Sequence, residues 1–185
     1  QKEPLGLGHA ILCARPLVGD EPFGVFLGDD IIVAETPCMR QLLDVYARYD
    51  GPVVAVMRIP GEDIGRYGVI QPKRLGGNVY EVLDMVEKPA PKDAPSDLAI
   101  IGRYVLTPDL FPILAETPAD ARGEIQLTNG LRTLQKRRPI YAVEFEGQRY
   151  DTGDKLGFLK ATVAFALARP DLRDEFRAYL KSLGL

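Results

Sequence analysis

Apolar residues in the first third of the chain follow two different spacings. Continuous apolar runs at residues 23–27, 31–33 and 53–57 are bounded by glycine, proline or acidic residues, a pattern typical of buried strands. Residues 6–14 instead indicate a short helix opened by glycines, and residues 39–49 carry apolar side chains at the spacing of one helix face. Helices and strands therefore alternate, which predicts an α/β fold with a mainly parallel mixed sheet flanked by helices.

The pattern changes after residue 66. Two apolar runs, residues 67–70 and 79–86, flank Gly76-Gly77-Asn78, a turn sequence that predicts a β-hairpin. Further strands are expected at residues 98–106 and 140–145. Helices are expected at residues 108–115 with Thr107 as the cap, 125–135, 154–168 and 170–183, the last with Pro170 in its first turn. Without a repeat or a linker, residues 1–185 are predicted to form a single domain.

Composition narrows the class of protein. The 185 residues are 46% hydrophobic and 26% charged, as in globular proteins, and suffice for one core. With 23 basic and 26 acidic side chains the chain has no excess of positive charge, which argues against a nucleic acid partner. No apolar run approaches the roughly 18 residues of a membrane span, so no membrane association is expected.

Cysteine and histidine are scarce. Cys13 and Cys38 fit neither a disulfide framework nor a zinc site, and reduced thiols predict a cytoplasmic protein. His9 is the single histidine, which leaves almost no material for a histidine metal site or a Ser-His-Asp triad.

Acidic residues follow predicted strands at two distant points. Asp29 and Asp30 come directly after residues 23–27, and Asp151 lies between a predicted strand and a helix. Open α/β sheets bind ligands where strands end, and two carboxylates there suit Mg²⁺ that bridges phosphate oxygens. The alternative is that each aspartate only forms a turn or caps a helix.

Three further segments could bind a ligand. Glu87 closes a hairpin strand and could accept sugar hydroxyls, while Lys88 could reach a phosphate; the alternative is a solvated strand end. Gly6 could let the backbone approach a flat base, or simply precede a helix. Glu124 could shape a sugar pocket or a subunit contact, or only complement a helix dipole.

Together these motifs resemble the bacterial UTP–glucose-1-phosphate uridylyltransferases (UDP-glucose pyrophosphorylases), a branch of the sugar-phosphate nucleotidylyltransferases. The resemblance runs from Gln1 to about Gly184. It rests on seven short motifs in order: Gly6-Leu7-Gly8-His9-Ala10, Leu27-Gly28-Asp29-Asp30, Arg66-Tyr67-Gly68-Val69, Val86-Glu87-Lys88-Pro89, Gly102-Arg103-Tyr104-Val105-Leu106, Gly123-Glu124-Ile125-Gln126-Leu127-Thr128 and Tyr150-Asp151-Thr152-Gly153-Asp154-Lys155-Leu156-Gly157.

The resemblance implies a Rossmann-like nucleotidyltransferase fold, with C-terminal helices, in an enzyme of carbohydrate metabolism. An oxygen of glucose-1-phosphate would attack the α-phosphorus of UTP in line, giving UDP-glucose and pyrophosphate. The implied roles are uracil contact for Gln1 and Gly6, Mg²⁺ binding for Asp29 and Asp151, glucose hydroxyl binding for Glu87, phosphate contact for Lys88 and backbone contact to the sugar for Gly68. Asp29, Lys88 and Asp151 would be the catalytic group. The resemblance also implies a homo-oligomer, a dimer or a tetramer.

The chain departs from the family pattern at one point. The family's N-terminal strand and glycine-rich loop, which hold the triphosphate, are absent, so residues 1–185 are expected to be the C-terminal two thirds of a nucleotidyltransferase domain and incomplete for catalysis. Two alternatives remain open: a thymidylyltransferase relative acting on glucose-1-phosphate, and a non-catalytic module that binds a sugar nucleotide.

Overall fold

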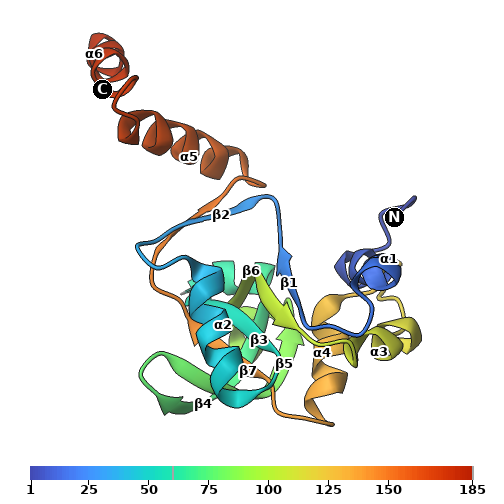
Figure 1. Cartoon of the computed structure of the whole chain (residues 1–185). Coiled ribbons are helices and arrows are strands. Elements are labelled where there is room, and N and C mark those ends of the chain that lie inside the picture. Colours follow the sequence, from blue (N-terminus) through green and yellow to red (C-terminus); the bar gives the residue numbers. More distant parts are fainter. Residues whose placement is uncertain (60, 185) are drawn as a thin grey trace.

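A six-stranded sheet forms the centre of the molecule in the computed structural model, which describes residues 1–59 and 61–184 (Figure 1). In spatial order its strands are β1 (Phe23–Phe26), β6 (Leu98–Leu106), β3 (Val53–Arg58), β7 (Tyr141–Glu144), β5 (Val79–Glu87) and β4 (Gly68–Gly76).

The sheet is mixed and flanked by helices, as the sequence predicts. Among the described strands β3 and β7 pair in parallel, and the other pairings are antiparallel. The parallel share is smaller than the alternating pattern indicated, because β6 lies between β1 and β3 and runs opposite to both. β1 and β3 therefore share a direction, as a strand–helix–strand unit requires, without being neighbours.

Helices cover both faces of this sheet. Three of them pack over one face around a large apolar cluster: α1 (Leu7–Val18), α3 (Leu110–Glu116) and α4 (Leu127–Gln135). The opposite face is covered by α2 (Cys38–Tyr49), which buries Leu42 and Val45 against β3, β6 and β7. Because the strands are buried on both faces, β3 reads as an apolar run, with Val53 to Val56 fully buried.

The predicted hairpin and most predicted elements are confirmed, with small errors at helix starts. β4 and β5 pair along their length around the predicted turn, where Gly77 has a φ of 56°. α3 begins at Leu110 rather than at residue 108, and Asp109, not Thr107, is its N-cap. Thr107 accepts a hydrogen bond from the Leu110 N–H through its carbonyl, so it closes a turn ahead of the helix.

A two-stranded ribbon leads away from the body to the C-terminal helices (Figure 1). It consists of β2 (Asp30–Val33) and β8 (Gln148–Asp151), followed by α5 (Lys155–Ala168) and α6 (Arg173–Ser182). The Asp154 side chain caps α5 by accepting from the Gly157 N–H at 2.9 Å. Pro170 is not in the first turn of α6, because the Leu172 N–H donates to the Arg169 carbonyl in a separate turn.

Two short 3₁₀ helices, Gly61–Arg66 and Pro91–Asp93, pack together beside β4 and β6. None of the helices in the described part of the chain has both the length and the apolar composition needed to cross a membrane.

Candidate active site

The ribbon brings together two carboxylates that lie far apart in the sequence. Antiparallel pairing of β2 and β8 sets Asp30 opposite Asp151, and the Thr152 N–H donates to the Asp29 carbonyl at 2.7 Å. The Asp29 and Asp151 side chains converge above Gly153. A Cβ on Gly153 would lie 2.9 Å from Asp29 Oδ2 and 3.3 Å from Asp151 Oδ1. The structure thus places the two predicted metal ligands at one point.

Asp30 has a different environment from its neighbour Asp29. It is buried, and its Oδ2 accepts a hydrogen bond from the Gly102 N–H at 2.8 Å. A Cβ on Gly102 would lie 2.6 Å from that oxygen, so only glycine lets the carboxylate rest on β6. Arg103 reinforces this anchor by donating to the Leu27 carbonyl at 3.1 Å. Asp30 therefore fastens the ribbon to the main sheet.

Arg149 is a site residue that the sequence analysis missed. Its side chain is 10% exposed, pairs with the Asp30 carboxylate, and places Nη2 3.1 Å from Asp151 Oδ2. Nη1 donates to the Tyr67 hydroxyl at 3.1 Å, and the guanidinium lies 5.3 Å from the centre of the Tyr67 ring. The available signal was strand alternation, which puts residues 149 and 151 on one face of β8.

The electrostatics of Arg149 favour its charged form. Burial lowers the pKa of Arg149, but the hydrogen bond and negative charge of Asp30, together with the Tyr67 hydroxyl, outweigh burial and raise that pKa. The side chain is thus a permanent cation between two carboxylates.

A pocket of about 300 Å³ opens beside this network. It contains three predicted site residues, Gly68, Glu87 and Lys88. The remaining lining residues are Leu7, Leu27, Arg66, Tyr67, Ile100, Tyr104, Glu124, Gln126, Leu127 and Thr128. Tyr67 lines the pocket and accepts a hydrogen bond from Arg149, which also donates to Asp151, so the pocket is linked to the carboxylate pair through these two side chains.

The predicted sugar-binding residues Glu87 and Lys88 lie side by side in this pocket. Lys88 Nζ lies 3.5 Å from Glu87 Oε1, and the Lys88 backbone has a φ of 46°, rare for a residue with a Cβ. Its N–H donates to the Tyr67 carbonyl at 3.0 Å, which fixes the turn after β5. Gly68 forms part of the wall, since a Cβ there would lie 2.8 Å from Thr128 Oγ1 and 3.2 Å from Glu87 Oε2.

Glu124 enters the pocket wall through a hydrogen-bonded loop before α4. Gln126 Nε2 donates to Glu124 Oε2 at 2.8 Å and to Asp120 Oδ2 at 2.9 Å. The Glu124 and Arg122 backbone N–H groups and the Gln126 amide lower the pKa of Asp120. Of the alternatives for Glu124, the structure favours a place in the pocket wall over a role limited to complementing a helix dipole.

Gln1 and Gly6 lie together at the start of α1. Gln1 Nε2 donates to the Gly6 carbonyl at 3.0 Å and lies 3.0 Å from His9 Nδ1. Gly6 has a φ of 92°, and a Cβ there would lie 2.8 Å from the Ile125 carbonyl oxygen. Gly6 is therefore required for the close contact with the Ile125 backbone, and this contact places the next residue, Leu7, at the pocket.

The carboxylate pair supplies some, but not all, of the ligands that a hard divalent cation needs. Two aspartate oxygens are typical Mg²⁺ ligands, and Mg²⁺ often takes its other ligands from substrate phosphates and water. Within residues 1–59 and 61–184 no group of three or more His, Cys, Asp or Glu side chains could hold a metal ion. The site suits a cation that is completed by substrate.

Comparison with known proteins places this arrangement in context. Residues 1–166 match the family model described as "Nucleotidyl transferase". Two proteins of Bacillus subtilis (strain 168), both named UTP–glucose-1-phosphate uridylyltransferase, are similar to the chain. One, YngB, is 52% identical over 183 residues, 99% of this chain and 62% of its own length. The other is 49% identical and is covered over 63% of its length. The chain thus spans less than two thirds of these relatives.

Solved structures give the same picture. A UDP-glucose pyrophosphorylase in complex with UDP-glucose matches with a TM-score of 0.88 and 46% identity over 91% of this chain and 65% of that one. A UDP-glucose pyrophosphorylase from Acinetobacter baumannii matches with a TM-score of 0.88 and 33% identity, over 98% of this chain and 64% of that one. A glucose-1-phosphate thymidylyltransferase from Bacillus anthracis, at 23% identity, shares the fold with a TM-score of 0.72.

Proposed function

Because the chain belongs to the nucleotidyl transferase family, we propose that it provides the sugar-binding and metal-binding part of a UTP–glucose-1-phosphate uridylyltransferase. The observation that carries this proposal is the connection between the pocket and the carboxylate pair. The pocket with Glu87 and Lys88 is linked through Tyr67 and Arg149 to Asp151, which lies near Asp29 beside Gly153. A sugar phosphate in the pocket would thereby bring its phosphate toward two metal-binding carboxylates.

The residues divide the work of an in-line displacement, which needs positioned reactants and neutralised phosphate charge. Glu87 would accept hydrogen bonds from glucose hydroxyls, the Gly68 backbone would contact the sugar, and the Lys88 ammonium would approach its phosphate. Mg²⁺, when bound by Asp29 and Asp151, would supply charge neutralisation on the phosphates. An oxygen of glucose-1-phosphate would itself attack the α-phosphorus of UTP and pyrophosphate would leave, so no protein nucleophile would be required and the products would be UDP-glucose and pyrophosphate.

The nucleotide base is assigned to the start of the chain. We propose that Gln1 and Gly6 face uracil, since the exposed Gln1 amide, whose Nε2 is held by the Gly6 carbonyl, has its oxygen to accept the N–H of the imide edge of a pyrimidine. Uracil and thymine share this edge, so preference for UTP over dTTP is proposed from the relatives that match most of this chain.

The proposal is tested with UDP-glucose, because this product engages the base, sugar and metal sites and lacks the leaving pyrophosphate. We expect calorimetry to detect Mg²⁺-dependent binding of UDP-glucose that is tighter than binding of dTDP-glucose. Asp29→Asn or Asp151→Asn should abolish the Mg²⁺ dependence, because each removes a negative charge at nearly constant volume. Arg132→Lys, a change at a surface ion pair with Asp84 on α4 and β5, serves as the matched control.

Two results would contradict the proposal. Equal affinity for the two sugar nucleotides would favour the thymidylyltransferase alternative. UDP-glucose binding with unchanged Mg²⁺ dependence in both aspartate variants would favour a non-catalytic binding module. Where pyrophosphate release from UTP and glucose-1-phosphate is measurable, the same variants should lower it at least about 100-fold.

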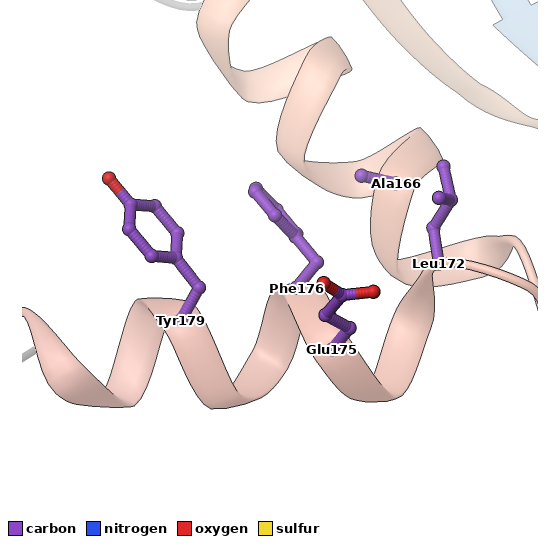
Figure 2. Close-up of a pocket in the computed structure, with 5 residues that line it drawn as sticks. All are labelled: Ala166, Leu172, Glu175, Phe176 and Tyr179. Atoms are coloured by element: carbon purple, nitrogen blue, oxygen red, sulfur yellow. The ribbon is translucent and has the colours of Figure 1, made fainter.

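We further propose that the protein is a homo-oligomer that assembles through α5 and α6. Within α5 the single buried residue is Ala161, while Leu156, Phe158 and Leu159 are 57%, 55% and 59% exposed. On α6 the rings of Phe176 and Tyr179 lie 6.3 Å apart. Figure 2 shows them with the other residues around a cavity of about 370 Å³: Ala166, Leu172 and Glu175. Contiguous apolar surface of this kind marks a protein–protein contact.

A cytoplasmic location is proposed from the two cysteines. Cys13 is exposed and Cys38 is buried, and neither forms a disulfide. Free thiols of this kind persist in reducing compartments.

A further inference from the structure

Arg149 binds one oxygen of Asp151 and leaves the other directed at the metal position. Its Nη2 lies 3.1 Å from Asp151 Oδ2. The second oxygen, Oδ1, accepts from the Gly153 N–H at 3.2 Å and, like Asp29 Oδ2, lies within 3.3 Å of the position that a Cβ on Gly153 would take. The carboxylate of Asp151 is therefore presented to a cation through a single oxygen.

The position of the guanidinium is itself determined from three sides. Arg149 also pairs with buried Asp30, donates to the Tyr67 hydroxyl at 3.1 Å and is 10% exposed. Asp30 in turn is fixed by the Gly102 N–H at 2.8 Å. A planar guanidinium holds two carboxylates at once in a fixed geometry, whereas the three donors of an ammonium rotate about a single nitrogen.

We infer that Arg149 is a positioning residue that restricts Asp151 to one-oxygen coordination and so selects Mg²⁺ over Ca²⁺. The inference rests on the proposed function, because it takes Asp29 and Asp151 as the metal ligands. Mg²⁺ demands nearly octahedral geometry, with one oxygen from each carboxylate. Ca²⁺ accepts carboxylates through one oxygen or two. Holding Oδ2 on an arginine thus removes the coordination that would favour Ca²⁺.

A purely structural role for Arg149 makes a different prediction. If the side chain only neutralised Asp30 and fastened the ribbon, its loss would weaken every divalent cation alike, since the carboxylates would shift together. Selection by coordination changes the ratio of the two affinities. The ratio of the Mg²⁺ and Ca²⁺ dissociation constants is therefore the informative quantity.

The experiment uses Arg149→Lys in the isotopically labelled chain. A lysine keeps the charge beside buried Asp30 but releases Asp151 Oδ2. Titration with MgCl₂ and, separately, CaCl₂ at saturating UDP-glucose, whose phosphates complete the site, is followed by the amide resonance of Gly153, whose N–H donates to Asp151 Oδ1. We expect the Mg²⁺ dissociation constant to rise by about 10-fold, as for other groups that orient metal ligands, while the Ca²⁺ dissociation constant falls or stays within about twofold.

Tyr67→Phe provides a second variant that keeps Arg149 and removes its hydroxyl acceptor. It should change the affinity ratio in the same direction by a smaller factor, and it tests the inference if Arg149→Lys does not fold. Arg132→Lys is the matched control, because Arg132 forms a similar fork with Asp84, at 2.6 and 2.7 Å, away from the site. It should leave both titrations unchanged.

The outcomes separate this inference from the proposed function. If the unsubstituted chain shows no saturable response to Mg²⁺ at Gly153, the metal site fails and both proposals fall. If it responds but Arg149→Lys weakens Mg²⁺ and Ca²⁺ by the same factor, Arg149 has only a structural role and the proposed function stands. A ratio shifted toward Ca²⁺ supports the inference.

Discussion

Gly68 keeps space open in the pocket wall because it has no Cβ. Its missing Cβ leaves space beside Thr128 Oγ1 and Glu87 Oε2, two atoms that take part in the proposed sugar site. Gly68→Ala should weaken UDP-glucose binding about 10-fold or more, a loss of roughly 1.4 kcal/mol, because the methyl group occupies this space. The unfolding free energy should change less, since both neighbouring atoms belong to side chains that can rotate.

Calorimetry and urea unfolding of the same sample measure these two effects. Gly24→Ala on β1 is the control, because the nearest atoms to a Cβ on Gly24 belong to Met39 and Phe26, at ordinary contact distances of 3.4 Å and more. Unchanged affinity in Gly68→Ala would show that the sugar does not approach this wall.

The residue types in short motifs predicted part of the candidate site. The other site residues were not predicted, because their role depends on burial and on pairing with distant residues. Glu87, Lys88 and Gly68 were assigned to a sugar site by motif, and the structure brings them into one pocket. Asp30 and Arg149 could not be distinguished from surface residues in the sequence, because their importance comes from pairing across 119 positions. A carboxylate that anchors the ribbon and one that faces a ligand look the same when adjacent in the chain.

At the scale of elements, α4 is fastened to β5 by an ion pair. Arg132 donates to both oxygens of Asp84, at 2.6 and 2.7 Å. The Arg132 hydrogen bond, with further help from the Met85 N–H, lowers the pKa of Asp84 against the opposing effect of burial. The charged form of Asp84 therefore stabilises the folded chain.

Asp84→Asn should lower the unfolding free energy at pH 7 by about 0.5–1 kcal/mol, a surface value, since Arg132 is about half exposed. A pKa depressed in the folded state stabilises above the unfolded value of about 3.9, and this contribution is lost as the pH falls through the folded pKa. Urea unfolding should thus show a difference at pH 7 that is smaller at pH 3. A difference of equal size at both pH values would contradict this origin.

Asp44→Asn is the control for this experiment. Asp44 forms an exposed pair with Arg40 one turn away on α2, and no measurable change is expected.

The sequence predicted which residues form strands and helices better than it predicted the order of the strands in the sheet. Apolar runs identified the strands because the sheet is buried on both faces, and a turn sequence identified the hairpin at Gly77. Helix starts were less certain, since Thr107 and Pro170 form turns that precede helices by a few residues. The placement of β6 between β1 and β3 depends on pairing across the whole chain, which local pattern does not encode.

At the scale of the whole molecule, two regions differ in how their apolar surface is covered. The main sheet is covered on both faces by helices, whereas α5 and α6 project from it on the ribbon and contact mainly β8 and each other (Figure 1). Apolar residues lie all around α5, a pattern typical of a helix that has packing neighbours on several sides. A second copy of the chain would supply those neighbours through a self-complementary two-fold contact.

Leu159→Glu should therefore shift the protein toward a monomer, because it places a charge among the exposed apolar side chains of α5. Sedimentation velocity over a range of protein concentrations measures the change. Leu17→Glu is the matched control, since Leu17 is 92% exposed on α1 and stands apart from α5; its assembly should be unaffected. If the unsubstituted chain and Leu159→Glu have the same monomeric mass at every concentration, α5 and α6 do not mediate self-association. Loss of assembly in both variants would instead indicate a non-specific response to added charge.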